Sequence, residues 1–222
     1  MNNIDWNFIV KVVSKSTFET LQMVLFSGIF STLLGFPLGI LLYSTNTNGI
    51  FPKPVFNQIL SRIVDILRSF PFIILMVLLF PLSRLILHTA IGTKATIIPL
   101  SIAAAPFVAR IIEGALIEVD PGVIQAARAM GSTNFQIIFK VLIPEAMPSI
   151  VSGITLTIIN LIGYSAMAGT IGGGGLGDLA IRYGYQRNRP EIMIPAVIVI
   201  IVLVLLIQMT GTLITNKIIS KR

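Results

Sequence analysis

The chain has 222 residues, of which 55% are hydrophobic and only 11% charged, and its mean hydropathy is +0.91. A soluble domain usually carries about 25% charged residues, so this composition excludes an ordinary soluble protein and indicates an integral membrane protein. The net charge of +7 comes from basic residues scattered between apolar runs, which is typical of membrane flanks and gives no reason to expect a nucleic-acid partner. The absence of cysteine excludes disulfides and thiolate metal sites, and a single histidine, His88, excludes multi-histidine sites.

Three long uncharged runs predict membrane-spanning helices. No charged residue lies in 20–52, 146–177 or 192–216. Each run exceeds the ~20 apolar residues that a helix needs to cross a bilayer. We therefore predict spans near 20–43, 149–170 and 192–215.

The first of these spans contains a stripe of small residues. Ser31, Gly35 and Gly39 recur at every fourth position, so they share one helical face that lets another helix approach closely. Pro37 lies in the same segment and is expected to kink the helix. The apolar run is too long for the core of a secretory signal, and no small-residue cleavage pattern follows it, so a retained helix is expected.

Two shorter uncharged runs, 69–83 and 95–109, lie in the middle of the chain. At about 1.5 Å per residue each falls short of the ~30 Å bilayer core, so both spans must recruit flanking residues. We predict spans near 63–84 and 90–112, joined by a short turn. The basic residues at the ends of the two runs, Arg68, Arg84, Lys94 and Arg110, are expected to extend outward, and Arg68 is also expected to pair with Asp65 three residues earlier. Five spans place the termini on opposite sides.

The longest segment that is not apolar enough to span is 113–148. Asp120 is suited to cap a helix whose first position is Pro121. Gly131 is suited to end that helix in the left-handed conformation. A second helix is expected after the glycine, limited by Pro144. The pattern predicts a short helix, a glycine break and another helix.

A motif with fixed spacing runs through this loop. It consists of Gln125-Ala126-Ala127, three residues, Gly131, nine residues, and Val141-Leu142-Ile143-Pro144. The spacing resembles the cytoplasmic motif of bacterial ABC importer permeases, which reads Glu-Ala-Ala, three residues, Gly, nine residues, Ile-x-Leu-Pro. The chain departs from it at Gln125, which removes a charge but keeps a hydrogen-bonding amide, and mildly at Val141 and Ile143. The segment 163–187 and the five-span layout resemble the methionine-type permeases.

The resemblance implies an all-α polytopic membrane protein, with residues 1–222 forming one transmembrane domain. It implies that the 113–148 loop carries a coupling helix that docks on a cytoplasmic ATPase. The coupling residues would then be Gln125, Ala126, Ala127, Gly131 and Pro144. The small alanines would offer a surface that fits a groove of the partner.

The same resemblance implies a set of partners and an orientation. Two copies of the chain would sit on two ABC ATPase subunits in the bacterial cytoplasmic membrane, surrounded by lipid, with an external substrate-binding protein or lipoprotein. The N-terminus would lie outside and the C-terminus in the cytoplasm. ATP and Mg²⁺ would bind to the ATPase subunits and no cofactor to this chain, which has no Gly-Lys pair from which a phosphate-binding P-loop could be built.

One face of the predicted 149–170 span collects unusual side chains. Thr157, Asn160, Tyr164 and Met167 lie at spacings of three, four and three residues, which places them on one helical face. Polar residues at membrane depth face protein or a water-filled path. Interhelical hydrogen bonding is one interpretation. The other is a translocation path lined by Asn160, Tyr164 and Met167, with Met167 as a flexible gate.

A glycine-rich segment follows that span. Gly172, Gly174 and Gly177 match the dinucleotide-binding pattern GxGxxG, but no βαβ unit surrounds them. We predict instead a tight external loop within 171–191, where the backbone bends sharply.

The preferred functional hypothesis is the membrane subunit of an ATP-driven importer of a small amino acid, which the resemblance narrows to methionine. The alternatives are a permease for another amino acid or for an osmoprotectant such as glycine betaine, and a structural membrane subunit without transport. A membrane-embedded enzyme would need converging nucleophiles, acids or metal ligands. The sequence offers almost none, so the chain itself is not expected to be an enzyme.

Overall fold

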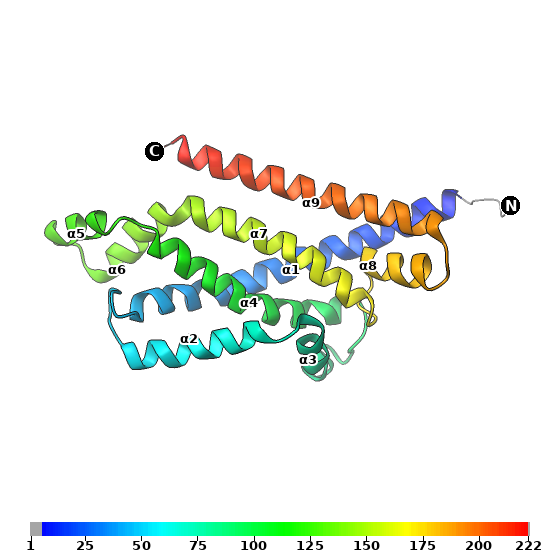
Figure 1. The fold of residues 1–222 in the computed structure, drawn as a ribbon, viewed down its shortest axis with the longest axis horizontal. Coiled ribbons are helices and arrows are strands. Elements are labelled where there is room, and N and C mark those ends of the chain that lie inside the picture. Colours follow the sequence, from blue (N-terminus) through cyan, green and yellow to red (C-terminus); the bar gives the residue numbers. More distant parts are fainter. Residues whose placement is uncertain (1–5, 222) are drawn as a thin grey trace.

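The computed structural model describes residues 6–221, which form helices joined by short loops (Figure 1). The long helices are α1 (Trp6–Thr45), α2 (Pro54–Ser69), α3 (Phe72–Leu87), α4 (Thr93–Ile117), α7 (Ile143–Gly169) and α9 (Pro190–Ile219). The short elements are α5 (Pro121–Ala129), α6 (Asn134–Gln136) and α8 (Gly175–Asp178), with π-helical turns η1 (Ile137–Leu142) and η2 (Leu179–Tyr185). The predicted all-α fold is confirmed.

Four helical segments are long and apolar enough to cross a membrane: α1, α4, α9 and the continuous run Asn134–Gly169 that contains α7. Helices α2 and α3 make a fifth if they count as one broken span, because they meet at an angle of 104°. The predicted 63–84 span corresponds to part of this broken pair and is not one straight helix. Phe70 and Pro71 have extended backbone between the two helices. A proline cannot donate to a preceding carbonyl and disfavours the helical conformation of the residue before it.

Helices α1 and α4 share the most extensive helix contact, and the predicted stripe of small residues lies between them. A β-carbon on Gly35 would lie 2.6 Å from the carbonyl oxygen of Ala105. A β-carbon on Gly39 would lie 2.5 Å from the β-carbon of Ile112. Ser31, on the same face, is buried. Small residues therefore set the distance between the two helices, as the spacing predicts.

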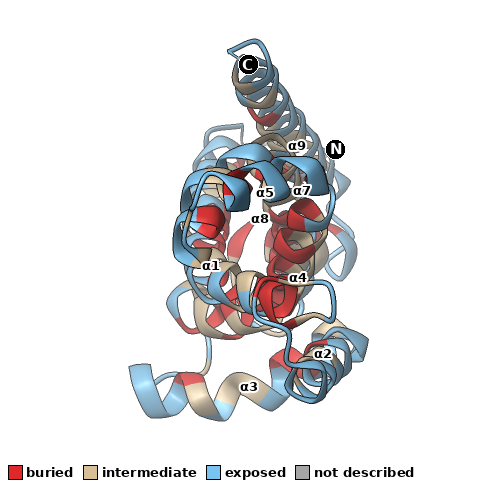
Figure 2. Cartoon of the chain, turned by 90° about the vertical axis from the view of Figure 1, so that its left-hand side faces the viewer, coloured by how far each residue is buried: buried red, intermediate tan, exposed pale blue. Residues whose placement is uncertain are grey.

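The buried residues gather where α1, α4 and α7 face one another, as the end-on view in Figure 2 makes visible. Helices α2, α3 and α9 lie outside this centre and expose most of their apolar side chains. Figure 1 places the start of α1 and the end of α9 at opposite ends of the bundle. Helix α5 lies at the C-terminal end and α8 at the N-terminal end, so the motif loop and the glycine-rich loop are separated by the full length of the bundle.

The glycine-rich segment turns the chain back after α7. Gly172, Gly174 and Gly175 have φ angles of +91°, +79° and +80°, a region that favours glycine, so the predicted sharp bends are confirmed. Helix α8 then packs directly on the end of α7, since a β-carbon on Gly177 would lie 2.2 Å from the α-carbon of Ala166. The described residues contain no strand, so they form no βαβ unit that could bind a dinucleotide.

Candidate functional site

Helix α5 is bounded by the two signals read from the sequence. The side chain of Asp120 accepts a hydrogen bond from the Gly122 N–H at 2.7 Å, with Pro121 at the first helical position. At the other end Gly131 has φ +81°, and the Ser132 N–H donates to the Ala127 carbonyl at 3.1 Å, which closes a glycine-based helix end. Both predicted boundaries are confirmed.

The helix that follows the glycine does not end at Pro144. Thr133 begins it with a capping box to Gln136, and the helical run then continues from residue 134 to residue 169. Proline normally clashes with the carbonyl four residues earlier. Here a π-helical turn precedes it, in which the Ile143 N–H reaches back to the Ile138 carbonyl, and this wider turn leaves space for the ring. Pro144 lies exposed in the first turn of α7.

Helix α5 turns one of its two motif alanines inward. Ala127 is 2% exposed and belongs to a cluster that also contains Leu116 of α4 and Ile137 of η1. Ala126 and Gln125 are exposed. The expectation that both alanines face a partner is therefore wrong: Ala127 fixes α5 to its own chain, because a helix lying on a core must bury one side.

Three large apolar side chains are exposed close to the motif in sequence. Met130 is 80% exposed, Phe135 67% and Phe139 58%. These residues occupy spacer positions of the motif, which the sequence predictions did not include. The signal available was their apolar character within the predicted 113–148 loop. Large exposed apolar side chains next to a coupling motif are suited to a protein contact.

The α7 face that runs from Thr157 to Met167 has a buried part and an exposed part. Thr157 is buried, and its hydroxyl donates to the Gly153 carbonyl of the same helix at 2.9 Å, so it lies away from any path. Asn160 and Tyr164 are partly buried, and Met167 is 49% exposed. The open part of the face therefore runs from Asn160 toward Met167.

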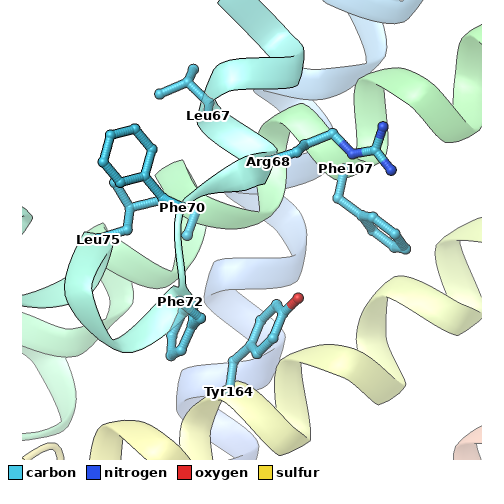
Figure 3. Close-up of a pocket in the computed structure, with 8 residues that line it drawn as sticks. Leu67, Arg68, Phe70, Phe72, Leu75, Phe107 and Tyr164 are labelled. Carbon is cyan, nitrogen blue, oxygen red and sulfur yellow. The ribbon is translucent and has the colours of Figure 1, made fainter.

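Tyr164 also contributes to a small pocket at the break between α2 and α3 (Figure 3). Its ring stacks on Phe72 with centroids 4.3 Å apart and planes 9° from parallel. The pocket has a volume of about 150 Å³ and takes its lining from α2, α3, α4 and α7. Across it, the Arg68 guanidinium lies 6.0 Å from the centroid of the Phe107 ring. The pocket thus combines one cation with several aromatic rings.

A charged network behind this pocket joins α2 to α4. Arg110 binds Asp65 at 2.8 Å and Glu113 at 2.6 Å, and it also donates to the Ser61 carbonyl at 3.1 Å. The expected Asp65–Arg68 pair is present but long, at 3.8 Å. The expectation that Arg110 extends outward is wrong, since its side chain is only 21% exposed. The planar guanidinium of Arg110 binds two carboxylates at once, one on α2 and one on α4. These bonds therefore hold the two helices together.

The opposite end of the bundle is held by α1. Glu19 accepts a hydrogen bond from the Gly175 N–H and Thr20 from the Leu176 N–H, both at 2.9 Å, so α1 fixes the start of α8. Burial raises the pKa of Asp178 in the same short helix, and Glu19 acts in the same direction while Arg182 lowers it. Within residues 6–221 no three histidine or carboxylate side chains converge to hold a metal ion.

Comparison with known proteins gives consistent matches over nearly the whole chain. Residues 35–221 match the family described as the binding-protein-dependent transport system inner membrane component. The chain is 49% identical over 203 residues to the probable D-methionine transport system permease protein MetI of Vibrio cholerae, covering 91% of this chain and 90% of that protein. It is 47% identical over 207 residues to the methionine import system permease protein MetP of Bacillus subtilis, covering 93% of each.

A solved structure has the same fold. The chain of an inward-facing MetNI methionine ABC transporter superposes with a TM-score of 0.91 at 43% identity, over 98% of this chain and 99% of that one. The broken α2–α3 segment and the short α5 helix are thus elements of a fold that occurs in a transporter.

Proposed function

The chain belongs to the family of binding-protein-dependent transport system inner membrane components, and we propose that it is the permease subunit of an ATP-driven importer of methionine. The observation that carries the proposal is the near-full-length identity, 49% and 47%, to two permeases named for methionine transport. A permease of this family works with an ATPase that is a separate protein, so the chain itself is not an enzyme.

The proposed assembly contains a second copy of the chain, two cytoplasmic ATPase subunits that bind ATP and Mg²⁺, and an external binding protein or lipoprotein. Helix α5 and the C-terminal end of α9 share one end of the bundle, which we assign to the cytoplasm of this multi-pass inner-membrane protein. The N-terminus then lies outside. The exposed Met130, Phe135 and Phe139 support the ATPase contact, and Gln125, Ala126 and Gly131 set the position of α5 within it.

Coupling follows from the way α5 is attached. ATP closes the two ATPase subunits and displaces α5, which cannot move alone because Ala127 is buried against Ile137 and its neighbours. The displacement passes into one continuous helical run from residue 134 to residue 169. That run carries Asn160, Tyr164 and Met167, roughly 40–50 Å from its start. The two copies of α7 therefore open and close the path around these residues.

The test is uptake by the reconstituted complex. The permease, its ATPase subunits and the binding protein are placed in vesicles, with ATP on the side of α5. We expect ATP-dependent accumulation of radiolabelled methionine that excess glycine betaine does not reduce. Accumulation of glycine betaine instead would establish the osmoprotectant alternative. The absence of any ATP-dependent uptake would contradict the importer and favour a structural subunit.

Gly131→Val is expected to damage coupling more than folding. A non-glycine residue pays about 1–2 kcal/mol in the left-handed region, and a β-branched residue adapts to it poorly. A β-carbon here meets no atom within 4 Å, so the strain is conformational and the angle of α5 changes. We expect an assembled complex with roughly tenfold slower substrate-stimulated ATP hydrolysis and uptake.

The matched control is Gly131→Asn, because asparagine tolerates the left-handed conformation. It should keep most of the activity. An assembled Gly131→Val complex with normal stimulated hydrolysis and uptake would remove the glycine from the coupling mechanism.

Met167→Ala is expected to weaken the closed state of the path. The substitution removes a flexible thioether chain that fills space at the open end of the α7 face. We expect faster basal ATP hydrolysis or solute leak, by a few-fold, at normal expression. Ile158→Ala, in the cluster with Met23 and Leu161, is the control and should affect stability only. Equal basal rates in both variants would refute the gate.

A further inference from the structure

Helix α2 carries a cation, Arg68, toward the middle of the bundle. The helix starts beside the end of α1, where the Lys53 N–H donates to the Thr45 carbonyl at 2.9 Å and the Asn57 side chain donates to the Leu42 carbonyl at 2.6 Å. From there its 16 residues run back along the bundle for roughly 24 Å. Arg68, in its last turn, therefore lies well inside the length of the bundle (Figure 1).

The neighbours of the Arg68 side chain show which way it faces. Its side chain is 39% exposed. A cation at membrane depth faces protein or a water-filled path rather than hydrocarbon. Figure 3 places Arg68, Phe107 and Tyr164 around the same space, with the Tyr164 hydroxyl directed toward the side of Arg68 and Phe107. Tyr164 belongs to the α7 face assigned to the path, so the pocket opens beside that path.

The guanidinium of Arg68 has N–H donors that form no short bond to its neighbouring carboxylate. Its carboxylate neighbour, Asp65, lies 3.8 Å away, beyond ordinary hydrogen-bond length. Asp65 accepts shorter bonds from Arg110, at 2.8 and 3.1 Å. The donors of Arg68 can therefore take a second carboxylate in the bidentate arrangement that a guanidinium favours.

The remaining lining is suited to an apolar side chain. Phe72 and Tyr164 form a stacked pair on one side, and Phe107 lies below the guanidinium. Aromatic rings attract a thioether sulfur as well as aliphatic carbon. The volume of about 150 Å³ is smaller than the ~300–1,000 Å³ of pockets that enclose a whole ligand. The pocket fits one side chain, while the rest of the ligand remains in the path.

We propose that this pocket is a transit site for a free amino acid, in which Arg68 binds the α-carboxylate and the rings of Phe72, Phe107 and Tyr164 receive an apolar side chain such as that of methionine. The proposal rests on the proposed importer function and adds to it a contact made by the permease itself. Arg68 acts as a selectivity residue, since an amine without a carboxylate gains nothing from it.

The experiment uses the absence of native cysteine. Ala103→Cys places one thiol in the pocket lining, and a small methanethiosulfonate reagent modifies it in the purified permease–ATPase complex. We expect methionine to slow the modification. Methylthiopropylamine, which is methionine without its carboxylate, should need about tenfold or more higher concentration for the same protection, because a charged hydrogen bond is lost.

Arg68→Gln in the same background should raise the half-protecting concentration of methionine by about tenfold or more and leave that of methylthiopropylamine unchanged. Arg62→Gln, an exposed position on the same helix outside the pocket, is the matched control and should alter neither. If the Arg68→Gln complex does not assemble, the comparison of the two ligands on the Ala103→Cys protein alone decides.

Equal protection by the two ligands would overturn the role of the carboxylate. No protection by methionine, in a complex that takes up methionine with ATP, would overturn the transit site and leave the importer function intact. Failure of the parent complex to take up methionine would instead overturn the proposed function.

Discussion

A single methyl group added at Gly39 is expected to destabilise the protein strongly. In Gly39→Ala the new β-carbon would lie 2.5 Å from the Ile112 β-carbon and 2.6 Å from the Ala109 carbonyl oxygen. Neither atom belongs to the flexible end of a side chain, so α1 and α4 must separate. Overpacking of a well-packed core typically costs about 1–3 kcal/mol. We expect the thermal unfolding midpoint of the purified protein to fall by several degrees.

Gly114→Ala is the matched control for this substitution. Gly114 lies in α4 as well, and a β-carbon there meets no atom within 4 Å. Alanine is favoured over glycine inside a helix by up to about 1 kcal/mol, so the midpoint should stay or rise. Equal midpoints for the two variants would mean that the small-residue stripe does not set the distance between α1 and α4.

Arg110→Met is expected to have a comparable or larger effect. The substitution keeps an unbranched apolar stem but leaves Glu113, which is only 10% exposed, and Asp65 without the cation that binds both. Removing one member of a buried ion pair typically costs about 3–5 kcal/mol. Because Asp65 is 55% exposed and partly screened by water, the lower end of that range applies. We expect low yield and a markedly lower unfolding midpoint.

A second substitution separates electrostatics from packing. In the double variant Arg110→Met with Glu113→Gln, the buried negative charge is absent, so part of the lost stability should return. A single variant as stable as the parent protein would show that the network does not hold α2 against α4. A double variant no better than the single one would assign the loss to packing of the Arg110 side chain.

The sequence signals that succeeded act over short distances. Asp120 with Pro121, and Gly131, define the ends of α5 through bonds to residues within five positions. The stripe at Gly35 and Gly39 needs only helical periodicity to be recognised. Such features depend on local backbone geometry, which a sequence determines directly.

The predictions that failed depend on tertiary context or on a neglected local signal. The length and charge of the 63–84 segment predict a span but not its break, which Pro71 causes. The partner of Asp65 is 45 residues away in α4, and nothing near either residue indicates the pair. The inward side of α5, at Ala127 rather than Ala126, is selected by the core beneath it. Helical spacing likewise placed Thr157 with Asn160 on one face but could not tell that Thr157 is covered.

The break at Phe70–Pro71 shapes the pocket on which the proposed transit site rests. It ends α2 where Arg68 can reach the space beside Phe107 and Tyr164, and it turns α3 away by 104°. The proline that breaks the predicted span therefore also ends α2 beside the pocket that contains Arg68.

The central claim, that α5 joins this chain to a cytoplasmic ATPase, is tested most directly by site-specific photocrosslinking in intact cells. A benzoylphenylalanine residue replaces Met130, which is 80% exposed beside α5, and in a second strain Tyr185, which is 77% exposed at the end of η2. Element η2 follows α8, which lies at the opposite end of the bundle from α5. We predict an adduct between the permease and the ATPase subunit from position 130, and none from position 185. An ATPase adduct from position 185 with none from position 130 would contradict both the coupling role of α5 and the orientation of the protein.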